Sequence, residues 1–250
     1  MRRGRLVAYL RFQLEDYLVQ RAAIALILVL FVAGLPLWST LRGQPDFFKG
    51  PRGAAFAMQL YSGTLALFLP VGAFLGGSAI VSTDRHQGFI RFYFSKPVNV
   101  LAYYVQTYVL HCLVFVALFG ALTWAFGAFT VHVSVHRAME AAALTFVLVG
   151  GLGFLLSTLT RFDGGLVVLL YVISMTLQQV VAQPARADVL PGWLRQLSRI
   201  LPPAYALDQL RNHLYAREAL DQWQLWHVIG YGAGAFLLGF FALRKLPLTR

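Results

Sequence analysis

The residues best suited to recognising another molecule lie in one polar segment, residues 82–97, between two long apolar stretches. Asp84 and Arg85 can form charge-assisted hydrogen bonds. Gly88 permits close approach of another backbone, and Pro97 can end a helix. Aromatic side chains anchor many interfaces, and this segment offers four: Phe89, Phe92, Tyr93 and Phe94. The pattern predicts a short helix along the membrane surface to which another protein binds. The alternative is a solvated loop with a basic rim.

A second group of polar residues lies near the ends of two apolar stretches. Gln59, Tyr61 and Thr64 stand near the start of one, and Gln178 and Gln179 near the end of another. Polar groups inside a membrane are costly and often face a partner or a pathway. If both ends point outward, these residues can line the exit of a pathway; otherwise they form hydrogen bonds between helices.

Three side chains with metal-binding chemistry, His132, His136 and Glu140, are spaced four residues apart. They would share one face of a helix and could then hold a metal ion. Valines alternate with polar residues from 131 to 136, however, which indicates an extended backbone that separates the three groups. We therefore expect no metal site, and nothing else in the sequence indicates a cofactor.

The sequence contains no pattern for holding the phosphates of ATP. The three lysines do not follow the glycine spacing that cradles phosphates; they are Lys49, Lys96 and Lys245. The sequence also lacks the helix motif of zinc proteases and any pair of acids within an apolar stretch. We therefore expect that this chain is not an enzyme and that any ATP hydrolysis belongs to a separate subunit.

The composition places these residues in a membrane protein. The chain of 250 residues is 58% hydrophobic and only 12% charged, whereas soluble domains carry about 25% charged residues. A helical span needs about 20 apolar residues. Six stretches meet that need: 22–41, 54–81, 98–127, 138–160, 165–182 and 224–243. They lack the two-residue alternation of a membrane barrel, so the sequence predicts an all-α integral membrane protein with one transmembrane domain, residues 1–250.

Three further segments complete the predicted architecture. Residues 1–21 combine arginines with leucines at helical spacing, which indicates an amphipathic helix at the membrane interface that leads into the first span. Residues 82–97 form the surface helix between the second and third spans. Residues 188–217 are too polar to span a membrane, and we expect two short re-entrant or surface helices there, separated by Pro202 and Pro203.

Six spans place both termini on the same side of the membrane, and the basic residues favour the cytoplasmic side. With that orientation the cytoplasmic pieces hold twelve of the 21 basic residues: Arg2, Arg3, Arg5, Arg11, Arg21, Arg85, Arg91, Lys96, Arg161, Arg244, Lys245 and Arg250. The net charge of +11 then reflects topology and attraction to anionic lipid, and it does not indicate nucleic-acid binding.

The order of these elements resembles the membrane subunits of ABC-2 type ATP-binding cassette transporters. The resemblance rests on an N-terminal amphipathic elbow, six spans and two motifs in order. One motif is Asp84-Arg85-His86-Gln87-Gly88 followed by Pro97, and the other is Leu190-Pro191-Gly192-Trp193 followed by Pro202-Pro203-Ala204-Tyr205-Ala206-Leu207-Asp208. Asp84 stands where the family more often has Glu, and the aromatic residues after Gly88 replace the commoner aliphatic ones.

The resemblance implies that residues 82–97 are a coupling helix seated on a separate nucleotide-binding subunit. It further implies a second transmembrane subunit, identical or related, in the cytoplasmic (inner) membrane. The expected function is the permease subunit of an ATP-driven exporter of a hydrophobic or amphipathic substrate. The alternatives are a membrane anchor or assembly factor with the same fold, and an integral membrane enzyme.

Overall fold

A computed structural model of the chain describes residues 11, 13–15, 17–23, 27, 34–44, 46–78, 80–82, 84, 100–160, 163–183, 190–216 and 218–245. Within these ranges the regular structure is entirely helical, which confirms the predicted all-α class. Five helices are long and apolar enough to cross a membrane: Pro51–Gly77, Leu101–Phe129, Val135–Leu159, Gly164–Val181 and Gln222–Lys245. These helices give the chain the character of a multi-pass membrane protein.

The membrane-length helices are α4 (Pro51–Gly77), α7 (Val100–Phe129), the continuous run α8–η4–α9, α10 (Asp163–Val181) and α14 (Gln222–Lys245). The continuous run consists of α8 (Val135–Thr145), a wider π-helical turn η4 (Phe146–Gly150) and α9 (Gly151–Leu159). Shorter helices are η1 (Tyr17–Ala22), α3 (Leu35–Gly43), η3 (Phe47–Lys49), α12 (Gly192–Ile200) and α13 (Ala204–Ala216). Residues 24–26 and 28–33 of the predicted first span, 22–41, lie outside the described residues, and α3 covers its end.

Two predicted boundaries need correction. The second apolar stretch was expected to be helical to residue 81, but α4 ends at Gly77 and Ser78 is extended. Two consecutive glycines weaken the helix at that point. The extended backbone predicted around residues 131–136 is also shorter than expected, because α7 continues to Phe129 and α8 begins at Val135.

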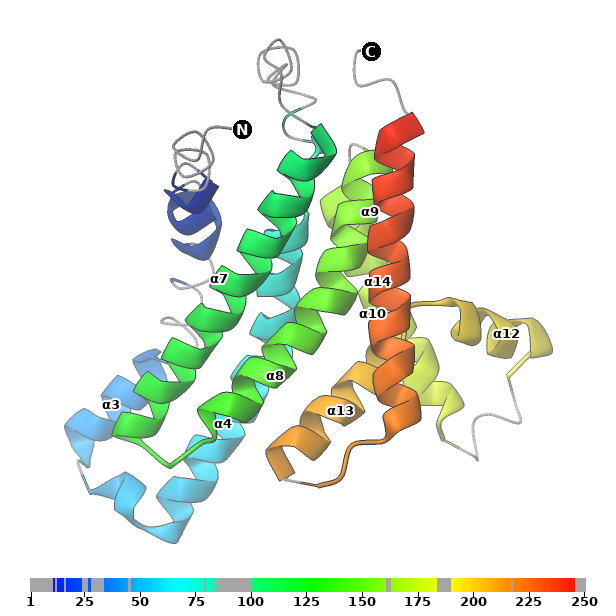
Figure 1. The fold of residues 1–250 in the computed structure, drawn as a ribbon. Helices are drawn as coiled ribbons and strands as arrows, with labels where there is room; N and C mark the ends of the chain where they lie inside the picture. Colours follow the sequence, from blue (N-terminus) through cyan, green and yellow to red (C-terminus); the bar gives the residue numbers. More distant parts are fainter. Residues whose placement is uncertain are drawn as a thin grey trace.

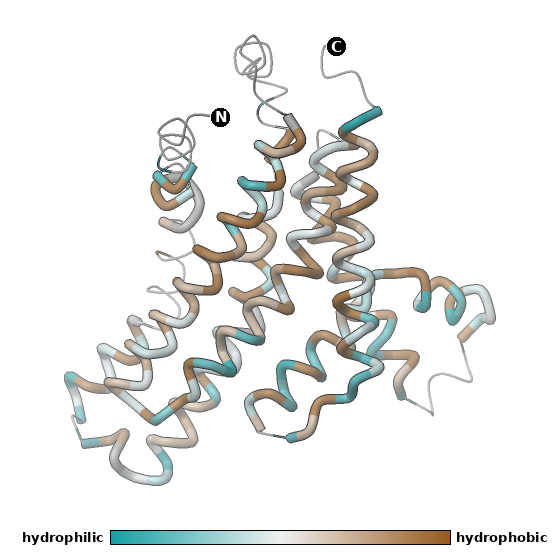
Figure 2. The backbone as a smooth tube through the Cα atoms, in the orientation of Figure 1, coloured by the Kyte–Doolittle hydropathy of each residue, from teal (hydrophilic) through white to brown (hydrophobic). Residues whose placement is uncertain are grey.

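The ends of the long helices gather at two ends of the bundle. In Figure 1 the start of α7 and the end of α14 lie together at one end, while α3, α13 and the start of α14 lie toward the other. Figure 2 shows apolar residues along the long helices and hydrophilic residues concentrated on α13 and at the tip of α14. This distribution suits helices whose middle lengths face lipid and whose ends face water.

The centre of the bundle depends on glycines that let backbones meet directly. A Cβ atom on Gly77 of α4 would lie 2.4 Å from the Cα of Gly150, and one on Gly151 would lie 2.3 Å from the carbonyl oxygen of Gly232 on α14. Small residues allow such close contacts, on which helix association in lipid depends. On α14 the glycine that makes this contact is Gly232. Gly230 and Gly234 have no atoms within 4 Å of their Cβ positions.

We predict that Gly232→Ala destabilises the bundle whereas Gly234→Ala does not. A Cβ on Gly232 would lie 2.3 Å from the carbonyl oxygen of Val147, so α14 would have to move away from the η4 turn, at a cost of about 1–3 kcal/mol. Thermal unfolding in detergent, followed by helical circular dichroism, measures the difference. Equal unfolding temperatures for the two variants would contradict the central packing described here.

Candidate functional site

The structure describes the predicted coupling helix only at its beginning. Asp84 lies next to the start of α7, where its carboxylate oxygen accepts a hydrogen bond from the Tyr104 hydroxyl at 3.3 Å. Tyr104 is fully buried, so this contact ties the entrance of the segment to the bundle interior. The other predicted coupling residues lie outside the described residues: Arg85, Gly88, Phe89, Phe92, Phe94 and Pro97.

The N-terminal segment contacts α7 through a buried polar side chain. Gln13 is only 4% exposed, and its amide nitrogen donates to the Thr107 hydroxyl at 2.6 Å. Its carbonyl oxygen accepts from the Gln106 amide at 3.4 Å. A buried amide that uses both of its ends fixes the orientation of two elements. The predicted elbow is therefore attached to α7 one turn beyond Tyr104.

His111 extends this contact to the end of α4. Its Nδ1–H donates to the carbonyl oxygen of Gly76 at 2.8 Å, and its ring lies 4.5 Å from the ring of Tyr17 in the N-terminal segment. His111 is buried, so the hydrogen bond satisfies a polar group that would otherwise be costly. The N-terminal segment thus touches both helices, α4 and α7, that flank residues 82–97.

The predicted pathway residues divide into exposed and bonded groups. Gln59 and Gln179 are exposed. The Thr64 hydroxyl donates a hydrogen bond to the carbonyl oxygen of Leu60 in its own helix at 2.6 Å. Tyr61 is buried, and its hydroxyl shares a hydrogen bond of 2.9 Å with Thr123 of α7. The role of these residues at a pathway exit stays a prediction.

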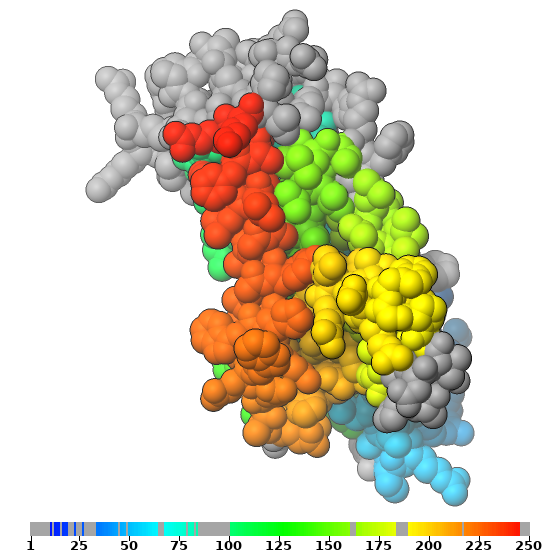
Figure 3. Space-filling view, turned by 90° about the vertical axis from the view of Figure 1, so that its right-hand side faces the viewer, coloured from blue at the N-terminus to red at the C-terminus, as the bar shows by residue number. Residues whose placement is uncertain are grey.

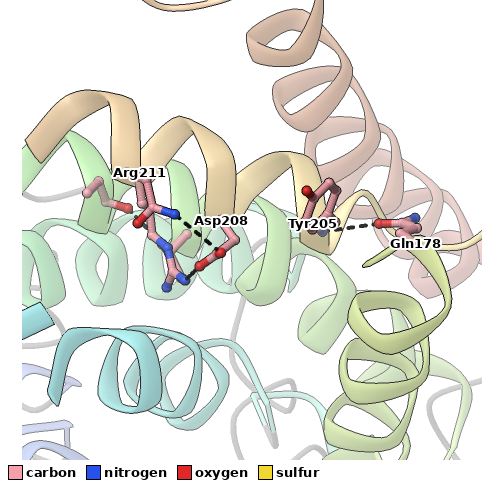
Figure 4. Close-up of polar contacts among 7 residues, drawn as sticks. Gln178, Tyr205, Asp208 and Arg211 are labelled. Atoms are coloured by element: carbon pink, nitrogen blue, oxygen red, sulfur yellow. Dashed lines mark hydrogen bonds and ion pairs between the residues drawn. The ribbon is translucent and has the colours of Figure 1, made fainter. Parts of the chain in front are cut away.

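Gln178 connects the end of α10 to the junction between α12 and α13. Its amide nitrogen donates to the carbonyl oxygens of Ser198 at 2.9 Å and Pro202 at 3.0 Å. Its carbonyl oxygen accepts from the Tyr205 backbone N–H at 3.1 Å, as Figure 4 shows. These bonds satisfy the Ser198 carbonyl oxygen, to which Pro202 offers no N–H, and the Tyr205 N–H at the start of α13. The Pro202 carbonyl oxygen also accepts from the Ala204 N–H at 2.7 Å. Gln178 thus holds the end of α12 and the start of α13 against the bundle.

The two short helices differ in burial. α13 packs against α8, α10 and α14, whereas α12 lies on the outside of the bundle beside α14 (Figure 3). Trp193 and Ile200 of α12 are 65% and 70% exposed, and Arg195 and Arg199 are exposed as well. An exposed helix with aromatic and basic residues suits a membrane interface.

Arg211 of α13 is a buried charged residue that the sequence analysis missed. It is only 5% exposed and forms an ion pair with Asp208 one turn earlier on the same helix (Figure 4). Charged side chains are rarely buried without a full set of partners. The sequence did carry a signal, because Arg211 shares helical spacing with the buried Leu207 and Leu214.

One polar atom of this ion pair, Nη1 of Arg211, is buried and has no hydrogen-bond partner among the described residues. The Tyr215 hydroxyl is buried as well, next to Tyr61. The two rings meet edge-on with 5.9 Å between centroids, and the Tyr61 hydroxyl is the side-chain neighbour that bonds that of Tyr215. Burial raises the pKa of the Tyr215 hydroxyl above its ordinary value, so the hydroxyl stays protonated and can donate.

The histidine arrangement on α8 also differs from the prediction. His136 and Glu140 do share a helix face, with 3.2 Å between Nε2 and Oε1, because the helix begins earlier than expected. His132 lies before the helix and does not join them. In the described ranges no three histidine, cysteine or acidic side chains come together as metal ligands. The pair is exposed, and an exposed i,i+4 contact contributes little to stability.

In comparisons with known proteins, no family model and no curated protein matches the chain. Function must therefore be argued from the geometry of this chain and from the resemblance of its motifs.

We predict that Gln178→Leu loosens α12 and the start of α13, whereas Gln179→Leu leaves them unchanged. The first variant leaves the Ser198 carbonyl oxygen and the Tyr205 N–H without their partner, at a cost of about 1–3 kcal/mol for each group that stays buried. Gln179 is its exposed neighbour and serves as the control. Hydrogen exchange of residues 190–207, followed by mass spectrometry, should be faster only in Gln178→Leu. Equal protection in both variants would contradict the bonding role of Gln178.

Proposed function

We propose that this chain is the membrane-spanning permease subunit of an ABC-2 type transporter that exports a hydrophobic or amphipathic substrate. The observation that supports this proposal most strongly is the buried contact of the N-terminal segment with α4 and α7. Gln13 bonds Thr107, and His111 bonds Gly76 beside Tyr17. An elbow fixed to the two helices that flank a surface helix can transmit a push on that helix to the bundle.

The proposed topology has six spans, with residues 22–41 as the first. Both termini and residues 82–97 then face the cytoplasm, and the chain sits in the inner membrane. The fold supports this arrangement, because the start of α7 and the end of α14 lie at one end of the bundle (Figure 1). The helices α12 and α13 lie at the outer half in this orientation.

The proposed mechanism takes its energy from a separate nucleotide-binding subunit. ATP binding draws two such subunits together and moves the surface helices seated in them. Residues Arg85, Gly88, Phe89, Phe92 and Phe94 provide the contact in this proposal. The motion passes through Asp84 and the buried contacts of Tyr104, Gln13 and His111 into α4 and α7. The bundle then shifts as a rigid body against a second transmembrane subunit.

We predict that the C-terminus lies on the cytoplasmic side. Twelve of the 21 basic residues lie on the segments assigned to that side, and such a bias sets orientation. Alkaline phosphatase, which is active only outside the cytoplasm, should remain inactive when fused after residue 250. A fusion of the same enzyme within residues 130–134, between α7 and α8, should be active. The reverse pattern would overturn the orientation and the proposed coupling surface with it.

We predict that substitutions in residues 85–94 separate the ATPase subunit from the bundle without unfolding it. Gly88→Trp should block close approach, and Phe92→Ala should weaken association by about 2 kcal/mol if the ring is a buried anchor. Arg85→Gln should remove a charge-assisted hydrogen bond. The measurement is co-purification of an ATP-binding cassette subunit from native membranes, together with expression level and unfolding temperature.

The control for these variants lies at the opposite end of the bundle. His132→Ala and Asp46→Ala change exposed residues in the connections on that side and should retain the ATPase subunit. Equal losses in the control and test variants would indicate general instability. Full retention of the subunit by Gly88→Trp and Arg85→Gln would show that residues 82–97 are only a solvated loop.

A further inference from the structure

The short helix α12 lies across the direction of the long helices. In Figure 1 it extends sideways from the bundle, and Figure 3 shows it on the outside, beside α14. Two polar contacts fix its level along the bundle. The Tyr231 hydroxyl of α14 donates to the Ile200 carbonyl oxygen at 3.1 Å, and the Gln178 amide of α10 donates to the Ser198 carbonyl oxygen at 2.9 Å.

These two contacts place α12 below the surface of the membrane that the long helices cross. Tyr231 precedes Lys245, the charged end of α14, by 14 residues, and Gln178 follows Asp163, the start of α10, by 15 residues. With a helical rise of about 1.5 Å per residue, both contacts lie about 20 Å from that end of the bundle. A hydrocarbon core is about 30 Å thick, so the end of α12 lies inside the leaflet at the other end, where α14 begins.

The exposed side chains of α12 divide into an apolar side and a basic side. Three exposed apolar residues recur at helical spacing along one side: Trp193, Leu197 and Ile200. Arg195 and Arg199 are also exposed and four residues apart. At about 100° per residue, the two arginines lie about 150° around the helix from the apolar side. The buried Ser198 lies between the two sides, so they flank the contact with the bundle.

The two arginines have no acidic partner among the residues that the structure describes. The Nε and Nη2 of Arg195 donate to the Leu190 carbonyl oxygen at 3.4 and 3.2 Å, which orients this guanidinium. Arg199 forms no hydrogen bond or ion pair within the described ranges. The helix α12 itself contains no acidic residue. Charged side chains at this depth are costly unless a partner or water reaches them.

Lipid phosphates are the groups that can reach the two arginines from the leaflet. Arginine side chains near the membrane surface extend toward the headgroups, and a guanidinium binds phosphate oxygens through two parallel hydrogen bonds. Arg195 and Arg199 bring two positive charges and no negative one. They therefore favour an anionic lipid over a zwitterionic lipid, whose ammonium group offsets its phosphate.

We infer that Arg195 and Arg199 bind the phosphate of an anionic phospholipid and that α12 draws this headgroup into the leaflet. The apolar side of α12 packs against acyl chains, and the two arginines hold the head on the opposite side. The membrane is therefore thinner beside α12 than around the rest of the bundle. The inference goes beyond the proposed transport function, because it depends only on a bundle that spans the membrane.

Spin labels measure the depth of α12 in lipid vesicles. The chain has one cysteine, so a Cys112→Ser background allows a nitroxide to be attached at a single site. Gln196→Cys places it on an exposed position of α12, and Gln44→Cys places it in the connection between α3 and α4. We expect the first label to meet oxygen, which concentrates in hydrocarbon, and the second to meet a water-soluble nickel chelate. Equal access of the chelate to both labels would place α12 in water and overturn the inference.

Lipid binding to the purified full chain is measured by native mass spectrometry from a neutral detergent. Phosphatidylglycerol and phosphatidylcholine with the same acyl chains share a phosphate and differ in the net charge of the head. We expect phosphatidylglycerol to bind more tightly, and equal affinities would overturn the inference. Each of Arg195→Gln and Arg199→Gln should weaken phosphatidylglycerol binding about 5-fold, and the double variant about 30-fold.

A matched pair of arginines controls for attraction to any surface charge. Arg42→Gln combined with Arg52→Gln removes the same charge from exposed positions on α3 and α4 and should leave phosphatidylglycerol binding unchanged. An equal loss in both double variants would overturn the site on α12. Arg199→Gln alone removes no contact among the described residues, so it keeps the test valid if the Arg195 variant is unstable. Inorganic phosphate at the concentration of the lipid should not displace it, and full displacement would overturn the choice of a lipid.

A second copy of the chain is the other partner that could neutralise the two arginines. In that case the double variant of Arg195 and Arg199 would lose a dimer and keep its lipid binding, which would overturn the inference. Loss of lipid with an unchanged oligomeric state supports it. None of these measurements uses an ATPase subunit, so their failure would leave the proposed permease function untouched.

Discussion

The close approach of three backbones at the centre of the bundle is the constraint on which the rest of the structure depends. Gly77 of α4 meets Gly150, and Gly151 meets Gly232 of α14. Lipid tails are as apolar as leucine side chains, so helices in a membrane gain little from hydrophobic burial and rely on close packing instead. The π-helical turn η4 lies at this junction.

Polar groups at the two ends of the bundle depend on this central packing. At one end, Gln13 of the N-terminal segment bonds Thr107 of α7, and His111 of α7 bonds the Gly76 carbonyl oxygen of α4. At the other, Gln178 fixes α12 and α13, while Arg211 stays only partly paired. A satisfied buried network is rigid, whereas an unpaired buried donor is costly. The chain thus combines an end whose buried polar groups are paired with an end that keeps one buried donor of Arg211 unpaired among the described residues.

Periodicity and composition predicted the helices but not the pairing of polar side chains. Hydrophobic stretches of span length identified the helical class and the approximate ranges of the long helices. The end of α4 and the start of α8 were misplaced, because local alternation and a glycine pair compete with helix continuation. Arg211 escaped attention because its burial depends on how α13 packs against α8 and α10, which the sequence does not reveal. The roles of Arg85, Gly88 and the following aromatic residues remain predictions, since those residues lie outside the described ranges.

The central claim, that this chain transmits energy released elsewhere, is tested most directly by ATP turnover in lipid. The purified chain alone, the ATP-binding cassette subunit that co-purifies with it, and the reassembled complex should be compared in the same vesicles. The account predicts background hydrolysis for the chain alone and a turnover in the complex that exceeds that of the isolated ATPase subunit. Robust hydrolysis by the chain alone, or an ATPase subunit whose turnover does not respond to the chain, would contradict it.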